Sequence, residues 1–223
     1  MFDGTPGAND LPVPAEIRVY PASRYGAVNS FAAGTMHVLE GLVTERPDLR
    51  ARYPASLPVG APSDAAGARQ PWELFPPFLP WSGAATIITA HTGYLAGGGV
   101  SGLRYVAQQA QNWCWTGSRD VTFYTFQGLS ADGAWYVAAF FPVRVPFAIP
   151  PYTPPEPADE AAYAATCDAA NAALAAALED LPGGAFIPSL GLLDALVASL
   201  RTDLPGGAGL ATARPGSAAG RLK

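Results

Sequence analysis

Lysine is almost absent from this sequence of 223 residues: Lys223 is the only one, and arginine supplies the other cationic side chains. Charged residues make up 14% of the chain, against about 25% in an ordinary soluble domain. The net charge is −5, and no arginine-rich stretch occurs. Because binding to nucleic acid needs a basic face that displaces counterions from phosphates, we expect no nucleic-acid partner.

Long hydrophobic runs are missing as well. The most apolar stretch, residues 134–149, is interrupted by Pro142, Arg144 and Pro146 and is shorter than a membrane-spanning helix. We therefore expect no transmembrane segment. The first residues lack the basic start and apolar core of a signal peptide. This is compatible with a cytoplasmic protein and with an exported protein whose signal has been removed.

Motifs for cofactor and metal chemistry are absent too. The sequence contains no H-E-x-x-H, no P-loop and no G-x-G-x-x-G. Its two histidines, His37 and His91, lack the neighbouring ligands that a zinc site needs. The expected strands carry no spaced pair of acidic residues that would indicate a hydrolase. We therefore assign no cofactor, no metal ligand and no catalytic residue.

Alternating and doubly apolar segments in the middle of the chain predict an antiparallel sheet. Residues 84–95 and 100–110 read as strands joined by a run of glycines, and residues 121–129 and 134–145 as strands joined by a turn that contains Asp132-Gly133. Residues 123–127 and 135–140 carry apolar side chains on both faces, so we expect these two strands to pair and to be central. Residues 16–20 read as a further short strand that can join the edge.

Helical periodicity appears on both sides of this region. We expect helices over residues 29–45, 159–181 and 188–201. The apolar side of the long second helix should bury Tyr163, Leu174 and Leu178 against the sheet. The apolar side expected for the last helix consists of Leu192, Leu193, Leu196 and Leu200.

These elements predict an α+β fold, with a largely antiparallel sheet of four to five strands and helices from both ends of the chain. We expect residues 15–203 to form a single domain, with a flexible arm over 1–14 and a flexible tail over 204–223. The long Pro/Gly/Ala segment over residues 53–83 contains aromatic residues and should lie on the core as an ordered strap.

Two groups of side chains are candidates for binding. Six aromatic residues lie outside the expected regular elements: Trp72, Phe75, Phe78, Trp81, Trp113 and Trp115. They can form a platform for a ligand or cover the ends of the sheet, and we favour the second interpretation. A polar set on neighbouring strands can line a pocket or form a buried network: Arg104, Tyr105, Gln108, Tyr124 and Gln127. The candidate binding residues are Trp72, Trp81, Trp113, Trp115, Arg104 and Tyr105.

Two strand motifs carry a resemblance. An R-Y-x-x-Q segment begins at Arg104, and an F-Y-T-F-Q-G-L-x-x-D-G hairpin spans residues 123–133. With them, the chain resembles a group of uncharacterised bacterial proteins, many of which look exported or lipid-anchored. The likeness also takes in residues 17–21 and 192–200, and so covers most of the chain. It implies one domain and an envelope location, but no catalytic residue. The chain departs from the group around Trp113-Cys114-Trp115.

Cys114 and Cys167 are the only cysteines. In a chain that resembles exported proteins, an oxidising compartment would pair them if the geometry allows. Two free thiols remain the alternative, since a cysteine on the core face of a helix commonly acts as a small hydrophobe.

The leading functional hypothesis is a non-enzymatic, exported domain that binds or scaffolds an envelope partner or a small ligand. The alternative is a hydrolase-type enzyme with a site in the loops near His91 and Cys114.

Overall fold

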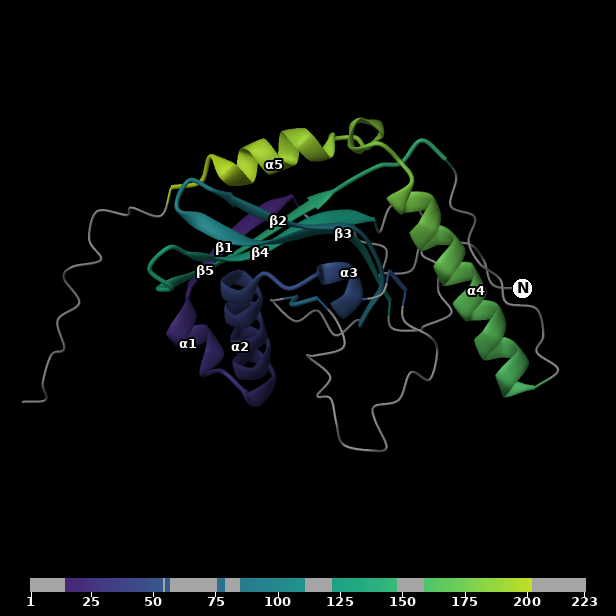
Figure 1. Ribbon diagram of the computed structural model, residues 1–223, viewed down its shortest axis with the longest axis horizontal. Coiled ribbons are helices and arrows are strands. Elements are labelled where there is room, and N and C mark those ends of the chain that lie inside the picture. The colour runs from purple at the N-terminus through teal and green to yellow at the C-terminus, as the bar shows by residue number, and fades with distance from the viewer. Residues whose placement is uncertain are drawn as a thin grey trace, which may run out of the picture.

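A computed structural model of the chain describes residues 15–53, 55–56, 76–78, 85–110, 122–147 and 159–201. Its centre is a five-stranded sheet in the order β1-β5-β4-β3-β2, in which every neighbouring pair is antiparallel (Figure 1). The strands are β1 (Glu16–Pro21), β2 (Ala85–Gly97), β3 (Val100–Ala110), β4 (Phe123–Ser130) and β5 (Trp135–Pro142). The expected α+β fold with a five-stranded antiparallel sheet is confirmed.

The two strands that are apolar on both faces are internal, as predicted. β4 lies between β3 and β5, and β5 lies between β4 and β1. Thr125 is opposite Phe140, and Gln127 is opposite Ala138. The hairpin turns at Gly133, whose φ of 68° is the left-handed conformation expected from the Asp-Gly pair.

The helices flank the sheet in sequence and cover it in space. They are α1 (Ala22–Gly26), α2 (Ser30–Glu45), α3 (Leu49–Arg52), α4 (Glu160–Glu179) and α5 (Leu190–Ala198). The three longest begin at residues whose side chains accept a hydrogen bond from a backbone N–H in the first turn: Asn29, Asp159 and Ser189. Within the described ranges, no helix combines the length and apolarity needed to cross a membrane.

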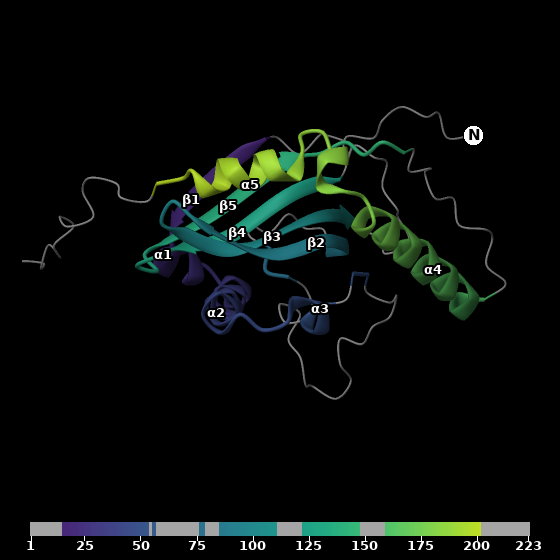
Figure 2. The same cartoon turned by 45° about the horizontal axis from the view of Figure 1, so that its top comes forward.

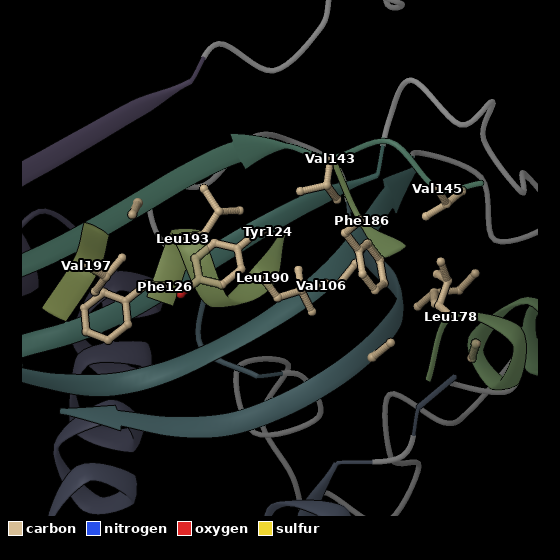
Figure 3. Close-up of a cluster of buried hydrophobic side chains, with 14 of the residues drawn as sticks. Val106, Tyr124, Phe126, Val143, Val145, Leu178, Phe186, Leu190, Leu193 and Val197 are labelled. Carbon is tan, nitrogen blue, oxygen red and sulfur yellow. The ribbon is translucent and has the colours of Figure 1, made fainter. Parts of the chain in front are cut away.

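The two faces of the sheet have different covers. Figures 1 and 2 show α1, α2 and α3 on one face and α5 on the other. Under α2 lies a cluster that includes Leu39, Leu103 and Tyr105. On the opposite face, Figure 3 shows side chains of β3, β4 and α5 packed together, among them Tyr124 and Leu193. Coverage on both sides explains why the central strands are apolar on both faces.

Part of the expected strap is visible. Pro76 and Pro77 are buried, and the ring of Phe78 packs between the rings of Phe123 and Phe140 with centroid separations of 5.7 and 5.4 Å. The Tyr105 hydroxyl donates to the Pro77 carbonyl oxygen over 2.8 Å. Residues 76–78 therefore lie on the core. The rest of residues 57–84, like the expected arm over 1–14 and tail over 204–223, lies outside the described residues.

Two expectations about helix packing are confirmed only in part. α4 extends away from the sheet and packs against the edge strand β2 near its last turns (Figure 2). Leu178 is fully buried, whereas Tyr163 and Leu174 are only partly buried. In α5 the buried residues are Leu190, Leu193 and Val197, while Leu192 is 62% and Leu196 is 42% exposed. The helix is therefore rotated relative to the apolar side inferred from its leucines.

Candidate functional site

His91 has an unusual backbone conformation. Its φ is 52°, in the left-handed region that side chains other than glycine rarely adopt. It lies in β2 at a register shift between Ala90 and Gly93, where the strand bulges away from β3. Bulges interrupt ladder hydrogen bonds, so the backbone groups of His91 need other partners.

The last turn of α4 contacts both the backbone and the ring of His91. The His91 backbone N–H donates to Glu179 Oε2, and its ring Nε2 lies 2.9 Å from the Leu178 carbonyl oxygen. Since a carbonyl only accepts, Nε2 carries the proton in this contact, and Nδ1 is the nitrogen left with the lone pair in the neutral ring. The rings of Phe186 and His91 are perpendicular, with centroids 5.3 Å apart. His91 therefore fixes the end of α4 to the sheet.

Arg104 on β3 binds the other side of the bulge. Its Nη1 donates to the His91 carbonyl oxygen, and its Nε lies 3.5 Å from Asp194 Oδ1 on α5. The same carboxylate oxygen accepts a hydrogen bond from the Tyr124 hydroxyl over 2.9 Å. Burial, and then the negative charge of Asp194, raise the pKa of Tyr124 strongly, so this hydroxyl stays protonated as a donor.

We call these side chains the bulge cluster: Arg50, His91, Arg104, Tyr124, Glu179 and Asp194. Arg50 on α3 pairs with Glu179 over 3.0 Å at the surface. Two arginines thus balance two carboxylates, and the contacts join α3, α4 and α5 to three strands. Among the described residues, no group of three histidine, cysteine or acidic side chains is placed to hold a metal ion. The arrangement primarily holds elements together.

The polar set expected on neighbouring strands is divided between the two faces. Arg104, Gln108 and Tyr124 lie on the α5 face, whereas Tyr105 and Gln127 lie on the α2 face. Gln127 accepts from the Tyr136 hydroxyl and donates to Thr125, and Gln108 donates to Thr122. Because all but Arg104 are fully buried, the set lines no common pocket and forms internal networks.

The structure describes only some of the other predicted site residues. Trp72, Trp81, Trp113, Trp115 and Cys114 lie outside the described residues. Cys167 is buried on α4, with 1% exposed. His91 meets a carboxylate, Glu179, through its backbone and not through its ring.

A feature that the sequence analysis missed is the surface of α5. Asp194, its only charged residue, faces Arg104 and Tyr124, and Ala198 packs toward Gly97 of β2. Since successive helical residues are rotated by about 100°, Leu192 and Leu196 lie on the flank of α5 opposite to Asp194. Ile187, just before α5, is 64% exposed. We call Ile187, Leu192 and Leu196 the α5 patch. α5 turns its one charged side chain inward and leaves Leu192 and Leu196 exposed, whereas a surface helix ordinarily exposes its charges and buries its leucines.

Comparisons with protein-family models, with curated proteins and with solved structures give no match to this chain.

Proposed function

We propose that this chain is a non-enzymatic, exported domain that binds or scaffolds a protein partner in the cell envelope. The observation that carries this proposal is the α5 patch. Three of the five large hydrophobic side chains that are exposed in the described residues belong to it. Exposed apolar side chains, with an adjoining charge turned inward, are typical of a surface that another protein covers.

The charge of the chain favours a protein over a lipid surface as the partner. Surfaces that bind acidic lipids present clustered lysine or arginine beside their apolar residues. This chain carries a net charge of −5, and α5 contains no basic residue. An apolar surface of another protein therefore fits the patch better than a membrane.

The cysteines support the exported location. The described part of the chain contains no free cysteine, which supports a Cys114–Cys167 bridge. Stable bridges of this kind form in oxidising compartments. The resemblance to exported bacterial proteins points in the same direction.

A hydrolase with a site near His91 and Cys114 is the second candidate. The left-handed backbone of His91, beside the carboxylate of Glu179, favours it, because strained residues gather at functional sites. Against it, the His91 ring is held by the Leu178 carbonyl oxygen, and the acid contacts the backbone.

The test places a photo-cross-linking amino acid at Leu192 or Leu196 in the producing cells, with Val28 as the control. Val28 is 69% exposed and lies between α1 and α2, on the other face. We expect one cross-linked protein from both α5 positions and none from Val28. The cross-linked partner, once identified and purified, should bind the wild-type chain. It should bind the Leu196→Glu variant at least about tenfold more weakly, which is the scale of one anchor residue.

Two results contradict the proposal. One is equal cross-linking from Val28 and Leu192. The other is co-sedimentation of the chain with phosphatidylglycerol vesicles that Leu196→Glu abolishes, which would make lipid the ligand. If no protein cross-links at Leu192 or Leu196, and wild type hydrolyses a p-nitrophenyl ester in a way that His91→Gln or Cys114→Ser abolishes, the enzyme replaces the binding domain as the proposed function.

A further inference from the structure

β1 is the strand at one edge of the sheet. Within the part of the chain that the structure describes, no strand pairs with its outer side. The Ala22 N–H donates to the Ala134 carbonyl oxygen on the β5 side over 2.9 Å. Because backbone groups alternate in direction along a strand, the even-numbered residues of β1 bond to β5. Ile17 and Val19 therefore direct their N–H and C=O groups outward. Pro21 belongs to the same outward set, where its lack of an N–H is tolerated.

The side chains of β1 are divided by face. Ile17 and Val19 lie opposite Ala139 and Val137, both on the α5 face, and Val19 is 48% exposed. Glu16 and Arg18 point to the other face, where they form an ion pair with each other. The edge therefore presents outward backbone groups, an apolar face, and one charge of each sign two residues apart.

We propose that β1 pairs antiparallel with β1 of a second copy of this chain, about a two-fold axis at Ile17. Ile17 then lies opposite Ile17 of the second copy, and the two sheets join into one. Glu16 lies opposite Arg18 of the second copy, and Arg18 lies opposite its Glu16. Opposite charges directly across an antiparallel pair are stabilising, and a two-fold axis produces this pair twice.

The charges select this register. To form hydrogen bonds, residues whose backbone groups point away from β5 must lie opposite the same kind of residue in the second copy. Only register shifts that keep each side chain on its own face of the sheet meet this condition. With the axis at Arg18, two guanidinium groups face each other, and with the axis at Glu16, two carboxylates do. With the axis at Val19, Pro21 lies opposite Ile17 and supplies no N–H. The axis at Ile17 avoids all three conflicts.

The strand is only six residues long, so the interface is short and the dimer should dissociate on dilution. The measurement is sedimentation equilibrium of the full chain from about 1 to about 500 micromolar, a range suited to a weak interface. We expect wild type to pass from monomer to dimer within this range. A chain that stays monomeric throughout overturns the proposal and leaves the edge to a strand of another protein.

Charge reversal provides the decisive variants. Glu16→Arg places two arginines on each strand, and Arg18→Glu places two glutamates, so each variant alone should be monomeric. Mixed together, they should form a heterodimer in which every pair across the axis again has opposite charges. Neither variant regains the ion pair within its own strand, so a heterodimer can come only from pairing across copies. Homodimers of either variant, or a mixture that stays monomeric, contradict the register.

A cysteine at the axis tests the geometry independently. Residues of a hydrogen-bonded antiparallel pair have Cα atoms about 5.5 Å apart, which a disulfide can span. Ile17→Cys should therefore cross-link into a dimer under mild oxidation. The control Val28→Cys, which is exposed but lies outside β1, should not. Equal cross-linking of the two contradicts the proposal. The result does not depend on the α5 patch, because neither Ile17 nor Val28 belongs to it.

Discussion

The Tyr124 hydroxyl on β4 donates a 2.9 Å hydrogen bond to the carboxylate of Asp194 on α5, which makes the only charged residue of that helix an internal contact. The same carboxylate lies 3.5 Å from Arg104 Nε. These contacts hold one flank of α5 on the sheet, while Leu192 and Leu196 on the other flank are exposed.

The first prediction concerns alkaline pH. Burial raises the pKa of Tyr124, and burial raises that of Tyr105. In the unfolded chain both tyrosines ionise near about pH 10. Above that pH the unfolded state loses protons that the folded state keeps, so the free energy of unfolding falls as pH rises. Below about pH 10 these two tyrosines do not reduce the free energy of unfolding, because they are protonated in both states.

Each such tyrosine contributes a slope of up to about 1.4 kcal/mol per pH unit. Urea titrations between about pH 9 and 11.5, around the tyrosine pKa, give this slope. Tyr124→Phe should unfold with a shallower slope than wild type. An identical slope would show that Tyr124 ionises equally in both states.

The second prediction tests the rotation of α5 with two neighbouring leucines. Leu193→Ala removes a side chain that is 3% exposed and leaves a cavity, so it should cost about 2–5 kcal/mol in the free energy of unfolding. Leu192→Ala should change it by less than about 0.5 kcal/mol, because its side chain is exposed. Chemical denaturation measures both. Equal losses would mean that both leucines are buried.

The third prediction concerns the His91 backbone. At most strand positions, a protein with glycine is less stable than one with alanine. At φ 52° the order should reverse, because only alanine has the Cβ that makes the left-handed conformation unfavourable. Both His91→Ala and His91→Gly lose the ring contact with Leu178. We expect the glycine variant to be about 1 kcal/mol more stable than the alanine variant. The opposite order in urea denaturation would place residue 91 in an ordinary conformation.

The fourth prediction is the Cys114–Cys167 disulfide. It would close a loop of about 53 residues and stabilise the fold by roughly 4 kcal/mol in the chain-entropy model. Intact mass after alkylation with and without reductant should differ by two alkyl groups, with none added before reduction. Alkylation of both thiols without reductant would show that they are free, and would remove a main support for the exported location.

The sequence predicted the sheet because its signals are local. Alternation, doubly apolar strands and the Asp132-Gly133 turn each act within a few residues. The orientation of the last helix could not be predicted in this way. Its sequence is apolar all round except at Asp194, so periodicity does not choose a face. Contacts with Arg104, Tyr124 and Gly97, distant in sequence, decide it.

The candidate site was less accessible to the same reasoning. Gly93 is a local sign of the bulge at His91, but the partners of His91 come from α4 and β3, distant in sequence. The polar set was identified correctly by residue type. Its division between the two faces of the sheet depends on the register of β3 with β4, which the sequence does not specify. The short helices α1 and α3 lack enough turns to show periodicity.

The turn between β2 and β3 has a consequence for biosynthesis. A Cβ on Gly98 would lie 1.8 Å from the Leu200 carbonyl oxygen, so the end of α5 rests directly on a hairpin made about a hundred residues earlier. On a translating ribosome, the hairpins of β2–β5 can form while Val106, Tyr124 and Phe126 still lack their cover. Until residues 190–200 emerge, that face of the sheet exposes apolar side chains to solvent. Chaperones should therefore bind chains that are stalled before α5.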